Sequence, residues 1–348
     1  MRFADVRLAG LSWLLPEERV SSDGLEERLA PLYDRLRLRR GRLELMSGIR
    51  ERRFWPPGTR PSGPATDAGR LALERAHVAP GEVELLVHAS VCRDFLEPAT
   101  ASVVHHGLGL SSDALLFDLS NACLGFANAL LLAAAQIDAG QIRCALVVAC
   151  EDGRPLVEET IAALLADPRI GKEELKRAFA SLTIGSGAAA AVLVPGARAP
   201  HAPRLLGGKV QAATEHHVLC HGDRPEGGGG PLMETDSEAL LVAGIDLARR
   251  TWPLFLEELG WERSPPERIV THQVGVAHRR ALLDALGVDP ARDYPTVEHL
   301  GNMGSVSLPL TLAQALESGH VAPGQRVGAL GIGSGLSCLM LGLERPPH

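Results

Sequence analysis

Short apolar runs alternate with longer segments of helical periodicity through most of the chain. The short runs are apolar almost throughout, which is typical of strands covered on both faces; they are Val83–Ala89, Ala114–Leu119, Cys144–Cys150, Ala188–Val194, Arg268–Thr271 and Val327–Ile332. The longer segments place apolar residues at helical spacing and are Ala65–Ala76, Gly125–Ala139, Ser237–Leu259, Ala277–Leu286 and Val306–Ser318. This alternation predicts a layered α/β fold with largely parallel sheets.

Both periodicities break at Pro195–Pro203, which marks a candidate boundary between two halves. We therefore predict an N-terminal half over residues 1–200 and a C-terminal half over residues 201–348. Each half alternates strands with helices and finishes on two adjacent strands, which suggests a duplicated architecture. The glycine-rich stretch Asp223–Pro231 holds one conformation only at high entropic cost, so a surface loop is favoured there over a ligand cradle.

Composition narrows the class of protein. With 348 residues, 45% hydrophobic and 22% charged, the chain can bury a large core as a globular enzyme does. A net charge of −7, with no basic run longer than Arg35–Arg42, argues against nucleic acid as the main partner. No segment approaches the ~20 apolar residues of a membrane span. The N-terminus lacks a signal-peptide pattern, and the cysteines are scattered without a CxxC pair, so we expect a cytoplasmic protein with reduced thiols.

Cys123 is the cysteine whose surroundings suggest chemistry. It lies where a predicted strand turns into an alanine- and leucine-rich helix, beside Gly125. Unpaired N–H groups and the positive end of a helix both favour thiolate, so Cys123 is a candidate nucleophile. A buried small hydrophobic residue is the equally weighted alternative, and the other five cysteines are expected to be structural.

His272 and Asn302 occupy similar turns between predicted strands and helices. His272 follows the strand Arg268–Thr271, where α/β proteins place catalytic groups, and it could act as a base or as a donor to an oxyanion. Asn302 lies between Gly301 and Gly304 and could donate to a developing negative charge. Taken alone, each residue is also explained by a structural role: a satisfied histidine and a helix cap.

The glycine-rich stretch Gly331–Gly335 superficially resembles a nucleotide-binding loop. No strand–helix–strand unit follows it, and the next residues predict another strand, so the nucleotide-binding interpretation fails. A hairpin whose N–H groups help to form an oxyanion hole is the better prediction.

Together these segments resemble the ketoacyl synthase III group of the thiolase superfamily, in their order and separations. The N-terminal stretch Ser47–Arg53 also matches that group, and the resemblance covers essentially the whole chain. The matching active-site segments are Asn121–Phe126, Thr271–Gln273, Gly301–Ser305 and Gly331–Gly335.

Within that group the chain looks most similar to the OleA type, the acyl-CoA-condensing thiolases of bacterial long-chain olefin biosynthesis. The stretch Ser90–Ser102 carries this similarity, supported by Leu29–Leu36 and Arg204–Leu219. In OleA-type enzymes a glutamate of this stretch projects into the active site of the dimer partner, and the matching residue here is Glu97. The residues alone would leave Glu97 as a solvated loop charge; the resemblance implies a base.

The resemblance also implies a five-layered αβαβα fold of two similar halves and a homodimer. It implies that Cys123 carries the acyl group, that backbone N–H groups of Cys123 and Ser334 hold the oxyanion, and that His272 and Asn302 bind the second thioester carbonyl. Substrates would be acyl-CoA thioesters, with acyl carrier protein as the alternative carrier; no resident cofactor or metal is expected. The coenzyme A contacts cannot be transferred, because Arg35–Gly41 replaces the tryptophan-bearing stretch of ordinary ketoacyl synthase III enzymes.

The expected reaction is a non-decarboxylative Claisen condensation of two long-chain acyl-CoA molecules, giving a β-keto acid or a β-ketoacyl-CoA. One alternative is a decarboxylative synthase that uses malonyl carrier protein, for which Glu97 would be incidental. Another is acyl transfer from Cys123 to an oxygen or nitrogen nucleophile. A papain-like hydrolase also uses Cys, His and Asn, but its nucleophile lies near the mature N-terminus, which disfavours it here.

Overall fold

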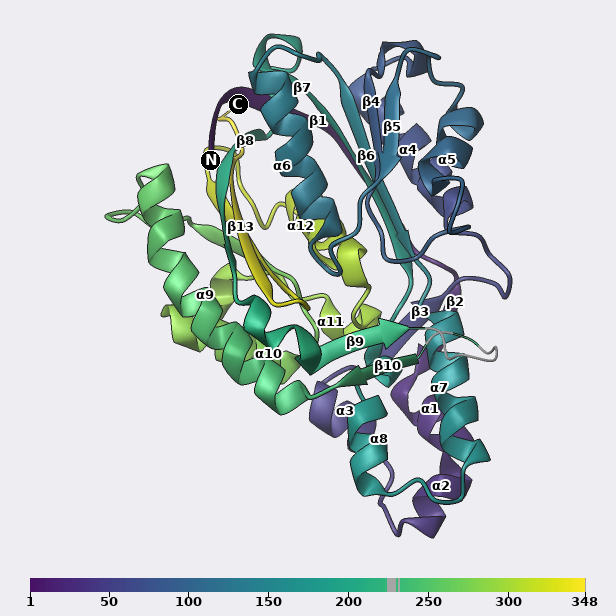
Figure 1. The fold of residues 1–348 in the computed structure, drawn as a ribbon. Coiled ribbons are helices and arrows are strands. Elements are labelled where there is room, and N and C mark those ends of the chain that lie inside the picture. Colours follow the sequence, from purple (N-terminus) through teal and green to yellow (C-terminus); the bar gives the residue numbers. More distant parts are fainter. Residues whose placement is uncertain (224–229, 231, 348) are drawn as a thin grey trace.

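Nine strands form one continuous hydrogen-bonded sheet in a computed structural model that describes residues 1–223, 230 and 232–347 (Figure 1). Most of the predicted loop Asp223–Pro231 therefore lies outside the described residues. The strands are β1 (Arg2–Leu14), β4 (Leu85–His88), β5 (Leu115–Asp118), β6 (Ala145–Glu151), β7 (Gly187–Pro195), β8 (Arg204–Ala212), β11 (Arg268–Thr271), β12 (Arg326–Gly333) and β13 (Ser337–Glu344). Their order in the sheet is β11-β12-β13-β8-β1-β7-β6-β4-β5.

The sheet consists of two arrays of the same design, joined where β1 meets β8. One array runs β5-β4-β6-β7-β1, and the other runs β11-β12-β13-β8. In the second array a single parallel bridge between Ile269 of β11 and Asp293 takes the position that β5 has in the first. From that edge inward, both arrays have two parallel pairings followed by two antiparallel ones. The duplicated architecture expected from the sequence is confirmed, whereas the division at residue 200 stays a prediction.

Helices cover both faces of each array and give the five predicted layers (Figure 1). On the outer face of the first array lie α4 (Ser62–Ala76) and α5 (Thr100–Leu108), and on that of the second lie α9 (Ser237–Leu259) and α10 (Val276–Leu286). Between the arrays lie α6 (Gly125–Asp138) and α12 (Ser307–Glu317). Alternate residues of each strand therefore face an outer or a central apolar core.

Two features differ from the sequence prediction. The sheet is mixed, because only β4–β5, β4–β6 and β11–β12 pair in parallel among the named strands, so the expectation of largely parallel sheets was wrong. Helices on both faces make a strand apolar throughout whichever direction its neighbour runs. The N-terminal β1 was not anticipated: Phe3, Val6 and Leu8 are buried while Asp5 and Arg7 point outward, which conceals an otherwise apolar strand.

A smaller lobe of short elements packs against one end of the layers, with an apolar core of its own (Figure 1). Its elements are the helices α1 (Ser22–Arg28), α2 (Ala30–Arg35), α3 (Arg42–Ser47), α7 (Arg154–Ala166) and α8 (Lys172–Ala178) and the strand pairs β2 (Glu18–Ser21) with β3 (Glu51–Phe54) and β9 (Cys220–Asp223) with β10 (Leu232–Thr235). The four-residue helix α11 (Val297–Leu300) precedes Asn302.

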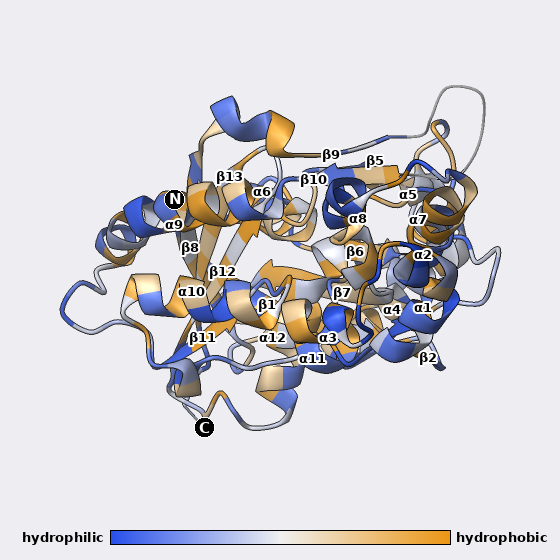
Figure 2. Ribbon diagram, turned by 90° about the horizontal axis from the view of Figure 1, so that it is seen from below, coloured by the Kyte–Doolittle hydropathy of each residue, from blue (hydrophilic) through white to orange (hydrophobic). Residues whose placement is uncertain are grey.

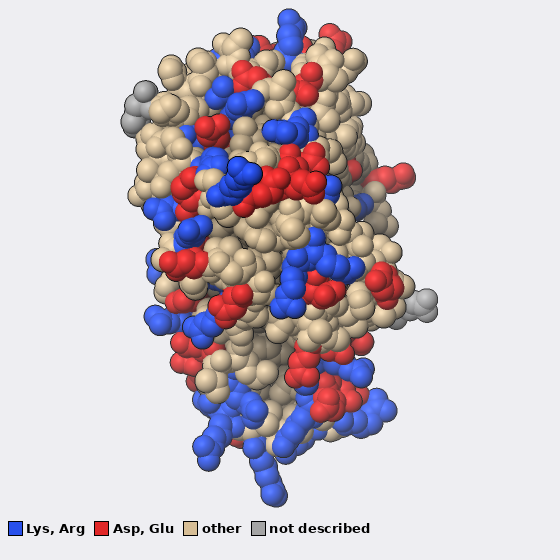
Figure 3. Space-filling model, turned by 90° about the vertical axis from the view of Figure 1, so that its left-hand side faces the viewer, with Lys and Arg blue, Asp and Glu red and all other residues tan. Residues whose placement is uncertain are grey.

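Polarity follows this layering. In Figure 2 the strands of the large sheet are mostly hydrophobic, whereas α2 and α8 at the periphery are largely hydrophilic. Figure 3 shows mixed charges over one face, with Lys and Arg side chains gathered at the end formed by the lobe. Within the described part of the chain, no helix has both the length and the apolar character needed to cross a bilayer.

Candidate active site

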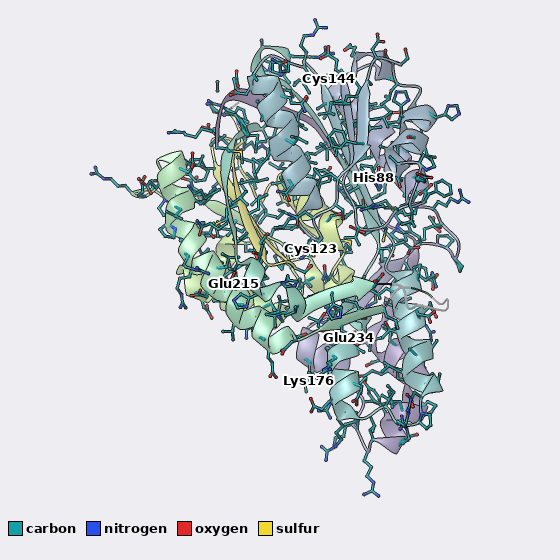
Figure 4. All side chains as sticks on the ribbon, viewed as in Figure 1. His88, Cys123, Cys144, Lys176, Glu215 and Glu234 are labelled. Carbon is teal, nitrogen blue, oxygen red and sulfur yellow. The ribbon has the colours of Figure 1, made fainter. Side chains whose placement is uncertain are left out.

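Cys123 lies at a sharp turn between β5 and α6, near the centre of the molecule (Figure 4). Ala122 directly before it has a φ of 45°, a left-handed conformation that costs free energy for any residue except glycine. Gly125 begins α6, and a side chain there would place its Cβ 3.4 Å from the carbonyl oxygen of Ala89 at the end of β4. The predicted position of Cys123 at a strand-to-helix turn is confirmed.

The thiol of Cys123 is protonated in the resting protein. Burial is the largest cause that raises its pKa to about 12; Glu151 and Cys220 contribute in the same direction, and the backbone N–H of Cys123 opposes the shift. The start of α6 was expected to favour thiolate, but burial outweighs that local effect. Cys123 therefore needs a base to become a nucleophile.

His272 can supply that base. It follows β11, and its backbone N–H donates to Leu330 of β12 at 2.8 Å. The side chain is buried, and neither ring nitrogen has a hydrogen-bond partner among the described residues. Burial lowers the pKa of His272 to about 4, so the imidazole is neutral at pH 7. An unpaired buried imidazole is costly, and His88 in the outer core shares this feature, so the position of His272 in the matching segment is what makes it the candidate.

Gln273 connects the turn at His272 to the segment that leads to Asn302. Its Oε1 accepts hydrogen bonds from the N–H groups of Thr296 and Val297 at 2.9 and 3.0 Å, and its Nε2 donates to the Tyr294 carbonyl at 2.7 Å. These bonds fix the start of α11, which ends just before Gly301 and Asn302. The sequence analysis assigned Gln273 no role, although it stands next to His272 in the matching segment.

Asn302 is held by its backbone and by its side-chain oxygen. Its N–H donates to Thr183 at 3.0 Å and its carbonyl accepts from Gly185 at 2.8 Å. Its Oδ1 accepts from the N–H of Gly304 at 3.0 Å within the turn. Met303 and not Asn302 is the N-cap of the short helix Gly304–Val306, so the helix-cap alternative was wrong. The Nδ2 group is then the donating end that remains for a ligand. Gly301 and Gly304 have φ values of 67° and 54°, as their positions in this turn require.

The Gly331–Gly335 stretch forms the predicted hairpin between β12 and β13, with Ser334 at its tip. The hairpin packs against Leu124, the neighbour of Cys123. A Cβ added to Gly331 or Gly333 would lie 2.5 or 3.0 Å from the Leu124 side chain. Only glycine permits this approach, which brings the hairpin next to the nucleophile's turn.

Glu151, at the end of β6, was missed by the sequence analysis and joins two parts of the site. Its carboxylate accepts hydrogen bonds from the N–H groups of Val91 and Cys92 and from the N–H and hydroxyl of Ser305. The sequence feature that could have revealed Glu151 is its position as a charged residue directly after the apolar run Cys144–Cys150. Cys220, expected to be structural, lies near Cys123 and contributes to the raised pKa of its thiol.

Glu97 occupies the loop between β4 and α5 and is exposed, unlike Cys123 and His272. Asp94 anchors this loop by accepting hydrogen bonds from the backbone and hydroxyl of Ser62. The action of Glu97 in a partner's site stays a prediction.

Comparison with known proteins decides the family. The profile described as 3-oxoacyl-[acyl-carrier-protein (ACP)] synthase III matches residues 117–209, and that of its C-terminal part matches residues 256–344. The chain belongs to the 3-oxoacyl-[acyl-carrier-protein] synthase III family. Both matched segments carry the site: the first contains Cys123 and Glu151, and the second contains His272, Asn302 and Ser334.

Members of this synthase III family resemble the chain over its full length. The acyl-CoA:acyl-CoA alkyltransferase of Shewanella oneidensis is 41% identical over 99% of this chain and 100% of that protein. Its namesake from Xanthomonas campestris is 38% identical over 98% of each chain. Crystal structures of Xanthomonas campestris OleA, among them a cerulenin-bound form, superpose with a TM-score of 0.94, 38% identity and coverage of 99% of this chain and 98% of theirs. This synthase III homologue is thus a condensing acyltransferase with the thiolase fold.

Proposed function

We propose that this chain joins two acyl-CoA thioesters by a non-decarboxylative Claisen condensation through an acyl-Cys123 intermediate. The observation that carries the proposal is the placement of Glu97. Solved structures of Xanthomonas campestris OleA include variants at a cysteine, a histidine and a glutamate. In that protein the substituted glutamate precedes the substituted cysteine by the same number of positions as Glu97 precedes Cys123 here. A chain that needs no decarboxylation needs such a carboxylate.

The first half-reaction acylates Cys123. Neutral His272 takes the proton of the thiol, and the thiolate attacks the thioester carbonyl of the first acyl-CoA. The N–H groups of Cys123 and Ser334 hold the oxyanion that forms. Coenzyme A then leaves as a thiol with the proton from His272, which returns the imidazole to its neutral form.

The second half-reaction forms the carbon–carbon bond. His272 and the Nδ2 group of Asn302 donate to the thioester carbonyl of the second acyl-CoA, and Glu97 of the partner subunit removes a proton from the adjacent carbon. The resulting enolate attacks the acyl-Cys123 carbonyl, and the Cys123 thiolate departs and is reprotonated. The product is a β-ketoacyl-CoA, or a β-keto acid where water cleaves its thioester.

A homodimer is part of this proposal, and the edge of the first array supports it. β5 is the end strand of the sheet, and the loop after β4 follows the same edge. Large apolar side chains are exposed there: Leu96 is 98% exposed and Leu115 of β5 is 55% exposed. Exposed apolar side chains beside an open strand edge are typical of surfaces that pair with another chain.

The test supplies purified protein with long-chain acyl-CoA as the only substrate. We expect free coenzyme A and a β-keto product, and acyl carrier protein thioesters serve as a comparison arm. Glu97→Gln should still release one coenzyme A per Cys123 while condensation falls about 10²–10⁴-fold. Glu17→Gln, at an exposed glutamate outside the site, is the matched control. Activity that requires malonyl thioester and releases carbon dioxide would overturn the proposal in favour of a decarboxylative synthase.

A further inference from the structure

Glu151 is a buried carboxylate that the mechanism above does not use. Its side chain is 5% exposed, and it is the last residue of β6. Hydrogen bonds from three backbone N–H groups and one hydroxyl satisfy it. No ion pair to Glu151 occurs within the described part of the chain. A carboxylate held by N–H and O–H donors alone is strongly oriented by them.

The donors come from two segments that lie far apart in the sequence. Val91 donates to Oε1 at 3.0 Å and Cys92 to Oε2 at 3.1 Å, and both begin the loop that carries Glu97. Ser305 donates its hydroxyl to Oε1 at 2.6 Å and its N–H at 3.3 Å, and it lies three positions after Asn302.

The turn at Gly304 packs tightly against this carboxylate. A Cβ on Gly304 would lie 3.2 Å from Oε1 of Glu151, and the φ of 54° at Gly304 excludes most other residues. The turn at Asn302 is thus closed directly onto the carboxylate that also holds the Glu97 loop.

We propose that Glu151 is a positioning residue that holds the Asn302 turn of its own subunit and the Glu97 loop in a fixed position relative to each other. Each subunit would then align the group that binds its own second substrate together with the base that it lends to its partner. This inference rests on the proposed function, because it requires Glu97 to act across the dimer.

The charge of Glu151 gives the proposal an independent signature. Glu151 raises the pKa of Cys123, so it opposes formation of the nucleophile that acylation requires. Glu151→Gln should therefore make Cys123 react several-fold faster with iodoacetamide at pH 8, while condensation falls about 10–100-fold because both segments lose their fixed relative position. Glu151→Asp keeps the charge and shortens the reach, so it should lower condensation without speeding alkylation.

Heterodimers with two different affinity tags test the coupling across the dimer. One subunit carries Cys123→Ala, which leaves its partner's site as the only working one, served by the loop of the inactive subunit. Adding Glu151→Gln or Glu151→Asp to the inactive subunit should lower condensation in the partner's site about 10-fold or more. Glu26→Gln in the same subunit is the matched control, because Glu26 is also buried and also accepts backbone N–H groups, of Gly41 and Leu43.

The outcomes separate the two proposals. Cys123→Ala with Glu97→Gln in the inactive subunit should abolish condensation; if it does not, Glu97 does not act across the dimer and the proposed function fails at that step. If that heterodimer is inactive but the Glu151 variants condense at the control rate, only the inference about Glu151 is wrong. Recovery of each heterodimer through both affinity tags shows that the variant subunit has folded and paired, and a burst of one coenzyme A per working Cys123 shows that its partner is active.

Discussion

In each array of the sheet, one parallel strand ends near a histidine. The two histidines nevertheless face different layers of the molecule. His88 is the last residue of β4, and His272 follows the last residue of β11. The next residue after His88, Ala89, donates its N–H to Val148 at 2.7 Å, and His272 donates its N–H to Leu330 at 2.8 Å. These two equivalent hydrogen bonds align Ala89 with His272, and therefore His88 with Thr271.

A difference of one residue places the two imidazoles on opposite faces of the sheet. His88 points with Leu86 toward the outer core under α4 and α5, whereas His272 points with Val270 toward the central layer that contains α6. Asp118 in the first array and Asp293 in the second lie beside His88 and Thr271 respectively. Two similar arrays therefore place one histidine in the outer core and the predicted catalytic histidine toward the central layer through a difference in strand register.

Removal of each histidine gives the largest expected contrast. His272→Ala should lower both acylation and condensation by about 10²–10⁴-fold, because the thiol of Cys123 loses its base. His88→Ala should leave the rate per folded site unchanged and only reduce stability. First-turnover release of coenzyme A, normalised to titrated Cys123, measures both. A folded His88→Ala protein without activity would contradict the comparison.

The two aspartates should differ in the free energy of unfolding. The Asp293 side chain is fully buried and pairs with Arg279 and with the N–H and hydroxyl of Thr271, so Asp293→Ala leaves a partly buried guanidinium and two buried donors without their acceptor and should cost about 3 kcal/mol. Among the described residues, Asp118 accepts hydrogen bonds from the N–H groups of Thr100 and Ala101 at the start of α5 and lies 3.7 Å from Nδ1 of His88, and Asp118→Ala should cost about 1 kcal/mol. Urea unfolding measures the difference, and equal losses would show that the two positions are equivalent.

Acid should destabilise the fold through both histidines. Burial lowers the pKa of His88 and of His272 from 6.5 to about 4, so both stay neutral in the folded chain and protonate in the unfolded chain. Each should reduce the free energy of unfolding by about 2 kcal/mol as the pH falls from 7 to 5, and the loss continues until the pH reaches about 4. His88→Asn and His272→Asn should each remove one such contribution, measured as urea midpoints at pH 7 and 5. Unchanged pH dependence in a variant would contradict the assignment for that histidine.

Residues at strand ends were the predictable part of the site. Cys123, His272 and Asn302 each combine a polar side chain, a preceding apolar run and nearby glycine or small residues, so local pattern made them candidates and the family resemblance joined them into one predicted site. Glu151 also follows an apolar run and has Gly153 two positions later, but its side chain pairs with no sequence neighbour. Its donors are about 60 and 154 positions away, and no local pattern encodes such contacts.

The predictions that were wrong, namely the thiolate form of Cys123, the strand directions and the missed strand β1, also depend on distant parts of the chain. Cys123 was expected to favour thiolate because only the adjacent helix start was visible; burial and Cys220 on β9 reverse that expectation. The direction of neighbouring strands depends on which segments meet, and an apolar run such as Ala188–Val194 is the same in either direction. β1 escaped notice because Asp5 and Arg7 interrupt its inward-facing apolar residues.

The single bridge between Ile269 and Asp293 also limits how copies of this chain can associate. Asp293 accepts the N–H of Thr271 at 3.1 Å, so a side chain covers the outer edge of β11 where a further strand would otherwise pair. At the opposite end of the sheet, β5 pairs only with β4 among the described strands. One open edge permits a symmetric contact that closes on itself. Two open edges would let copies add end to end, so the asymmetry between the arrays guards against filaments.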